Sequence, residues 1–188
     1  MKNINFKTFL MLGVIVSFIS CKAQTFPLNT LMDDIPQNAY VKDFNNELRP
    51  YIGIYKAVHD GNEITLYITK EENKLTKRAN KQFYRDALVV KYIVKNSAGV
   101  VLQDTYNFNN PNIRFYSIGT TPLKNRVDFI YSGTNCNVGW GDIYLSKINA
   151  TQISWDYRPD SMLTDKCPPG TDINIYLPVV DNLIFTKQ

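Results

Sequence analysis

Histidine and the common catalytic motifs are nearly absent from this chain of 188 residues, which contains one histidine. That residue, His59, precedes Asp60-Gly61, a pair typical of a hairpin turn. The chain has no zinc-binding, phosphate-loop or dinucleotide-binding motif, and no familiar spacing joins a nucleophile to a base and an orienting group. We therefore predict a protein that is not an enzyme and that uses no cofactor and no metal ion. A hydrolase would require carboxylates that meet in a cleft of the folded chain.

The chain also lacks an apolar run long enough to span a membrane, since a transmembrane helix needs about 20 apolar residues. A shorter apolar stretch covers residues 9–19, follows Lys2 and Lys7, and ends at Ser20. A basic start, a short apolar core and a small residue at the end are the three parts of a secretory signal peptide. Residues 1–20 are therefore predicted to be a signal peptide.

The residue after this segment is a cysteine, and Phe18-Ile19-Ser20-Cys21 resembles the bacterial lipobox. Phenylalanine stands where that motif usually has leucine, which keeps the position apolar. The resemblance implies that Cys21 carries a lipid and becomes the first residue of the mature protein. An ordinary signal peptide with a cysteine near the cut is the alternative. Because bacterial lipoproteins carry two or three acyl chains, we expect a lasting attachment to the membrane through Cys21.

No charge of one sign dominates, since 21 basic residues face 17 acidic ones. We therefore expect no nucleic-acid partner. The densest basic region is residues 70–86, where Lys and Arg outnumber Asp and Glu. This region is predicted to be a long solvated connection between two strands, or alternatively a surface for anionic headgroups or an acidic partner.

Cysteine is scarce, and assigning Cys21 to lipid leaves Cys136 and Cys167. An even pair in an oxidising compartment predicts a disulfide, which we favour over a metal pair or a reactive thiol. Glycines and Trp140 surround the first of these cysteines in residues 133–141, which predicts a tight loop. Together with residues 165–172 this loop would form a lobe stapled by the disulfide, serving stability alone or also recognition.

Sustained helical periodicity is missing, and after residue 50 apolar and polar residues alternate with a period of two. Turns rich in Asn, Gly and Pro separate the alternating segments. The strands are predicted at residues 52–59, 63–70, 87–96, 100–106, 113–118, 126–132, 142–148, 152–158, 173–177 and 183–187.

This pattern predicts an all-β domain over residues 50–188, built as a single antiparallel meander of about 8–10 strands. We favour a closed barrel over a β-sandwich because closure protects every strand edge. Residues 48–56, with Gly53 two positions before Tyr55, resemble the opening strand of lipocalin-like barrels, although tyrosine replaces the usual tryptophan. Residues 21–49 show little periodicity and are predicted to be the lipidated N-terminus and a tether.

The chain as a whole resembles small lipoproteins of unknown function that are common in Bacteroidota. The segments that carry this resemblance are residues 21–30, 61–70, 134–141 and 166–178. The resemblance implies a location in the cell envelope on the outer membrane, but no activity. Surface-exported lipoproteins of that group often carry an acidic run after the cysteine. Residues 22–25 contain none, which favours an anchor that faces the periplasm.

Aromatic residues are abundant, with 12 tyrosines and 10 phenylalanines. They suit strands, and they also suit a pocket for a sugar or a lipid. The first hypothesis for function is a binding module that holds an apolar or amphipathic small molecule inside the barrel, in a cavity of a few hundred cubic ångströms. The alternative is a protein-interaction or structural lipoprotein of the envelope, with a packed interior and an exposed apolar patch on the stapled lobe.

Overall fold

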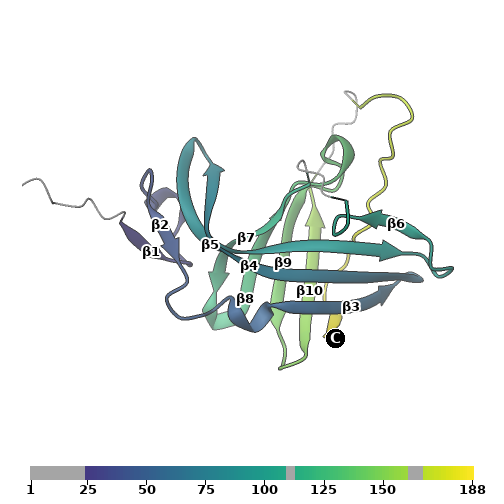
Figure 1. Cartoon of the computed structure of the whole chain (residues 1–188), viewed down its shortest axis with the longest axis horizontal. Helices are drawn as coiled ribbons and strands as arrows, with labels where there is room; N and C mark the ends of the chain where they lie inside the picture. The colour runs from purple at the N-terminus through teal and green to yellow at the C-terminus, as the bar shows by residue number, and fades with distance from the viewer. Residues whose placement is uncertain (1–23, 109–112, 161–166) are drawn as a thin grey trace, which may run out of the picture.

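A computed structural model describes residues 24–108, 113–160 and 167–188 of the protein (Figure 1). The predicted signal peptide and Cys21 lie outside these residues. Helical structure in the described part is confined to short 3-10 turns: η2 (Met32–Asp34), η3 (Arg49–Tyr51), η4 (Pro122–Lys124) and η5 (Asn135–Asn137). None of the helices in these ranges is long and apolar enough to cross a membrane.

The predicted all-β fold is confirmed, and its strands form a closed antiparallel barrel rather than a sandwich. The strands are β1 (Thr25–Pro27), β2 (Tyr40–Lys42), β3 (Gly53–His59), β4 (Asn62–Arg78), β5 (Lys81–Lys95), β6 (Val101–Asp104), β7 (Phe115–Thr121), β8 (Arg126–Tyr131), β9 (Gly141–Lys147), β10 (Gln152–Pro159) and β11 (Leu183–Lys187). Eight of them close the barrel in the order β5-β4-β3-β11-β10-β9-β8-β7. The closing contact pairs Val89 of β5 with Tyr116 of β7.

Two of the strands run well past the barrel. Residues 70–86, predicted to be a solvated connection, instead extend β4 and β5 into one long hairpin, which the cross-strand pairs continue as far as Arg78 and Lys81. The hairpin bends at an irregularity between Glu71 and Lys74, where the register shifts. Figure 1 shows its end projecting from the barrel beside β1 and β2.

The N-terminal segment of the described chain packs against this hairpin. β2 runs parallel to β5, and β1 runs parallel to β2. Leu28, Ile35 and Val41 are buried in the hydrophobic core. The tether predicted for residues 21–49 is therefore wrong from residue 24 onward. Its apolar residues lack periodicity because irregular chain and short turns, rather than one regular element, bring them to the core.

One predicted strand, residues 173–177, does not form. The Asp172 carboxylate accepts hydrogen bonds from the Asn174 backbone N–H, at 3.0 Å, and from the Tyr176 hydroxyl, at 2.7 Å. A side chain that binds its own local backbone offers the chain an alternative to a strand ladder. The segment is therefore irregular chain that leads from the disulfide toward β11.

Candidate functional site

The inside of the barrel is filled by its own side chains. Seven rings, each within about 6 Å of a neighbouring ring, form one continuous cluster: Tyr92, Phe115, Phe129, Tyr131, Trp155, Tyr157 and Phe185. All seven are at most 3% exposed. We predicted a ligand cavity inside the barrel, but the described side chains fill that space.

The polar tips within this cluster are paired. The hydroxyls of Tyr92 and Tyr131 lie 2.6 Å apart, and the Tyr92 hydroxyl also donates to the side-chain oxygen of Gln103. The indole N–H of Trp155 donates to the carbonyl of Pro178, and the Tyr157 hydroxyl donates to the carbonyl of Gly139. Burial raises the pKa of Tyr131 to about 12 and raises the pKa of Tyr92 further, so both stay neutral at ordinary pH.

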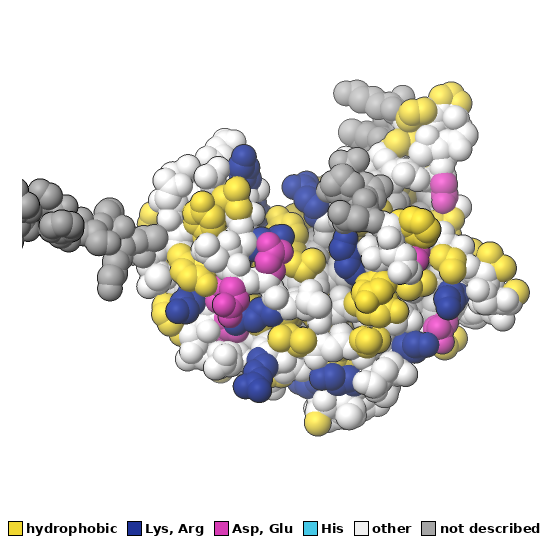
Figure 2. Space-filling model, viewed as in Figure 1, with side chains coloured by type: hydrophobic (Ala, Val, Ile, Leu, Met, Phe, Trp, Pro, Cys, Tyr) yellow, Lys and Arg dark blue, Asp and Glu magenta, His cyan; other side chains and the backbone are white. Residues whose placement is uncertain are grey.

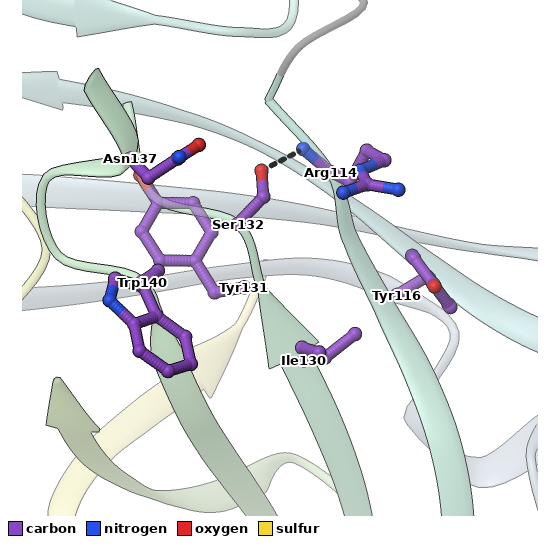
Figure 3. A pocket seen from close by; sticks show the side chains of 7 residues that line it. All are labelled: Arg114, Tyr116, Ile130, Tyr131, Ser132, Asn137 and Trp140. Carbon is purple, nitrogen blue, oxygen red and sulfur yellow. Dashed lines mark hydrogen bonds between the residues drawn. The ribbon is translucent and has the colours of Figure 1, made fainter. Parts of the chain in front are cut away.

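Open space lies instead on the outer face of the barrel, between β7, β8 and the loop that carries the disulfide. A pocket of about 340 Å³, which we call the aromatic pocket, is lined by Arg114, Tyr116, Ile130, Tyr131, Ser132, Asn137 and Trp140. In Figure 3 the indole of Trp140 stands on one side, Arg114 and Tyr116 stand on the other, and Ile130 lies between them. The Trp140 side chain is 41% exposed, so an apolar surface is available to a ligand.

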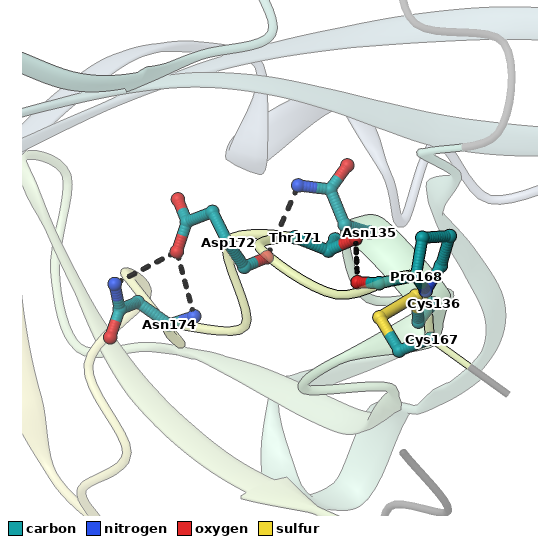
Figure 4. Close-up of a disulfide and its surroundings, with 7 residues drawn as sticks. All are labelled: Asn135, Cys136, Cys167, Pro168, Thr171, Asp172 and Asn174. Atoms are coloured by element: carbon teal, nitrogen blue, oxygen red, sulfur yellow. Dashed lines mark hydrogen bonds between the residues drawn. A yellow bond between two sulfur atoms is a disulfide. The ribbon is translucent and has the colours of Figure 1, made fainter. Parts of the chain in front are cut away.

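The disulfide loop fixes the position of Trp140. Cys136 and Cys167 form a disulfide with Cα atoms 5.8 Å apart, as the sequence predicted (Figure 4). The loop begins at Gly133, whose φ is +74° and whose added Cβ would lie 2.5 Å from backbone atoms of Asn137. Only glycine fits such a turn. The loop closes on itself where the Trp140 N–H donates to the Asn137 carbonyl at 3.1 Å, and this turn carries the indole to the barrel rim.

A second pocket, of about 460 Å³, adjoins the first at Arg114 and Tyr116. We call it the basic pocket; it is lined by Lys74, Leu75, Lys77, Val89, Val90, Lys91, Ile113, Arg114, Phe115 and Tyr116. Four of these described lining residues are cations, and none is a carboxylate. Figure 2 shows Lys and Arg side chains along the hollow beside the projecting hairpin.

Tyr116 joins the two pockets into one groove. Its ring lies on the outer face of β7, and the ammonium of Lys74 from the hairpin is 5.8 Å from the ring centroid. Lys74 also forms an ion pair with Glu71 at 2.7 Å, which orients its side chain along the hairpin. The groove therefore has an apolar aromatic end at Trp140 and a cationic end beneath the hairpin.

The comparison with protein families gives one result: a family model matches the chain over residues 1–188. The chain belongs to the family of unknown function DUF6705. No curated protein and no solved structure matches the chain. Membership in DUF6705 thus supplies no biochemical role, and the groove is the best guide to function.

Sequence reasoning found only part of this DUF6705 groove. Trp140 and the cysteines were singled out, and so was the basic region 70–86 that supplies Lys74 and Lys77. Arg114, Tyr116 and Ile130 were missed, because they read as ordinary outward residues of strands. Their outward position opposite a basic hairpin could have marked them as groove residues, but the hairpin itself was not predicted.

A buried polar cluster elsewhere in the DUF6705 chain has a structural role. The Asp86 carboxylate accepts hydrogen bonds from the Tyr40 hydroxyl and from the backbone N–H groups of Asp43 and Asn73. Desolvation raises the pKa of Asp86, but these hydrogen bonds outweigh that effect and hold the pKa below its usual value. Lys70 pairs with Asp43 at 3.3 Å, so the cluster ties the N-terminal segment to the hairpin. In the described ranges, no three His, Cys, Asp or Glu side chains come together as a metal site.

Proposed function

We propose that this DUF6705 protein is a non-enzymatic binding module of the cell envelope, anchored by a lipid on Cys21, which holds an amphipathic small molecule in its outer groove. The observation that carries the proposal is the continuity of the groove through Tyr116, from an exposed indole to a row of cations. Aromatic and aliphatic walls suit the apolar part of a ligand, and the cations suit its polar end.

The size of the groove supports a small molecule. Pockets that bind small molecules commonly measure about 300–1,000 Å³. The aromatic pocket alone, at about 340 Å³, reaches that range, and the basic pocket adds further space. The walls are held by β7, β8 and the disulfide loop, so the aromatic end is formed before a ligand arrives.

A lipid on Cys21 would be close in sequence to the first strand of the domain. β1 begins at Thr25, four positions after Cys21. An extended chain covers at most about 3.6 Å per residue, so a lipid on Cys21 would hold β1 within about 15 Å of the membrane. A module held this close to a bilayer is well placed to exchange an amphipathic ligand with it.

A charge placed on the floor of the aromatic pocket tests the proposal. We expect Ile130→Asp to weaken binding of an anionic, environment-sensitive dye such as anilinonaphthalene sulfonate at least ~10-fold, because a carboxylate would face the apolar and the anionic parts of the probe. Ile54→Asp is the matched control, since Ile54 also points outward from a strand, β3, and is 43% exposed. Equal binding by both variants would contradict the proposal.

Native mass spectrometry of the protein from its own host would identify a retained ligand.

The alternative, a protein-interaction lipoprotein, is favoured by a different observation. Trp140, Ile173 and Val179 are each more than 40% exposed on or beside the stapled lobe. The test is to isolate the protein from membranes together with its bound partners. A protein partner that covers this surface would be missing from the Trp140→Ala variant. Loss of dye binding without loss of any partner would favour the small-molecule function.

A further inference from the structure

Arg85 of β5 is a buried cation without a counter-charge in the described structure. Its side chain is 2% exposed, and its Nε and Nη2 atoms have no hydrogen-bond partner among the described residues. The guanidinium carbon lies 5.8 Å from the centroid of the Phe83 ring. Burial lowers the pKa of Arg85 to about 10; Tyr116 opposes this shift and the positive charge of Arg78 adds to it.

Such an arrangement is costly in a folded protein. Burying a charged group without hydrogen bonds or an ion pair is unfavourable by several kcal/mol, so buried charges are normally paired. The structure pairs other buried polar groups of the same hairpin well, as the Asp86 cluster shows. A guanidinium whose Nε and Nη2 have no partner, in the residue directly before Asp86, therefore points to a partner that binds from outside the chain.

The strand register places Arg85 beside Lys74, a lining residue of the basic pocket. Arg85 is the cross-strand partner of Lys74, so the two side chains lie on the same face of the hairpin. Val89, four residues further along the same strand and on the same face, lines the basic pocket and pairs with Tyr116. Lys74 in turn lies over the Tyr116 ring. Arg85 thus lies beside Lys74, close enough to Tyr116 for that residue to influence its charge, where the hairpin joins β7.

We propose that Arg85 binds the phosphate group of an amphipathic phosphate ester, whose apolar part occupies the aromatic pocket. This inference rests on the proposed function and names its ligand class. A guanidinium offers a planar fork of donors that matches phosphate oxygens, and charge-assisted hydrogen bonds of this kind are the strong ones. Lys77 and Arg114, which line the basic pocket, supply further positive charge, and this charge favours a multiply charged phosphate over a single carboxylate.

The experiment compares two ligands that differ only in the phosphate. Dihexanoyl phosphatidic acid and dihexanoylglycerol are titrated calorimetrically into the full chain as its host processes it, with inorganic phosphate as a third probe. We expect phosphatidic acid to bind at least ~10-fold more tightly than dihexanoylglycerol, because a charge-assisted hydrogen bond to a buried donor exceeds a tenfold effect. If inorganic phosphate binds as tightly as phosphatidic acid, the ligand of the site is free phosphate and not a phosphate ester.

Variants assign the effect to Arg85. We expect Arg85→Met to abolish the preference for phosphate, to keep binding of dihexanoylglycerol, and to leave the melting temperature unchanged or higher, because it removes an unpaired buried charge. Arg49→Met, which removes the same charge from an exposed position outside the groove, should keep the preference. Lys77→Met, at an exposed lining position, should reduce the preference without affecting folding.

The outcomes separate the two proposals. If neither lipid binds, the proposed function itself fails. If both lipids bind equally to the unaltered chain, the ligand-binding function stands and the phosphate site is overturned. A preference that survives Arg85→Met, or an Arg85→Met protein that is less stable than the unaltered chain, would show that Arg85 serves the fold and would also overturn the inference. An unchanged preference in Lys77→Met would count against the basic pocket.

Discussion

The ammonium of Lys74 lies 5.8 Å from the centroid of the Tyr116 ring, and this contact joins the projecting hairpin to the wall of the barrel. Lys74 belongs to β4 and Tyr116 to β7, and the link between them runs through β5, which pairs with β7 at Val89 and Tyr116. A cation–π contact at a partly exposed site contributes about 0.5–1 kcal/mol. The contact lies in the middle of the groove and is a weak link between the hairpin and the barrel wall.

Replacing Tyr116 by Leu should therefore loosen the hairpin without unfolding the barrel. We expect backbone amides of the hairpin beyond Glu71 to exchange hydrogen faster, while amides of β9 and β10 remain protected. Hydrogen exchange followed by mass spectrometry would measure this. Tyr67→Leu is the matched control, since Tyr67 stacks on Tyr106 at 3.9 Å on β4 but outside the groove. Equal exchange in the two variants would contradict a role for the Lys74–Tyr116 contact.

Glycine at position 133 is required by space as well as by backbone angle. Gly133→Ala should lower the free energy of unfolding by about 2 kcal/mol or more, because its Cβ would lie 2.5 Å from the backbone of Asn137 at a φ of +74°. Gly99→Ala has nearly the same φ, +78°, but nothing lies within 4 Å of its Cβ, so we expect about 1 kcal/mol. Urea denaturation of both variants measures the difference. Similar values would show that crowding at the disulfide loop is unimportant.

The segment before β3 should contribute to stability. Val41 of β2 is 0% exposed, and Val41→Ala should lower the free energy of unfolding by about 2 kcal/mol through the cavity it leaves. Phe44→Ala, only a few residues away but 53% exposed, should have little effect. If residues 24–44 were only a tether, both variants would melt at the temperature of the unaltered chain.

Alkaline pH should destabilise the barrel through its buried tyrosines. Burial raises the folded-state pKa of Tyr131 and of Tyr51 to about 12, from an ordinary value near 10. The unfolded chain loses these protons first, so the stabilisation is complete below pH 10 and falls as the pH rises from 10 toward 12. Urea denaturation between pH 8 and 11.5 should show a decline that is shallower in Tyr131→Phe. An identical slope in that variant would rule out a contribution from Tyr131.

The strands of the barrel were predictable where one face is buried. Ile64, Leu66 and Ile68 alternate with polar neighbours, and the structure places all three in the core at 1% exposure or less. The hairpin extension at residues 70–86 was not predictable in the same way. There β2 pairs with the edge of β5, and residues 85–88 are all buried in succession, so burial follows no simple alternation. Residues 173–177 show the reverse error, since their alternation was overridden by the hydrogen bonds of Asp172.

By itself, the sequence determined the all-β class, the pairing of Cys136 with Cys167 and the tight loop that carries Trp140, because periodicity, cysteine number and glycine content act locally. Only the tertiary structure decided where a ligand would bind. The aromatic residues could equally have lined a cavity, but they meet across the barrel and fill it. The outer groove, and the isolation of Arg85 within the described chain, exist because strands distant in sequence converge on one edge of β5.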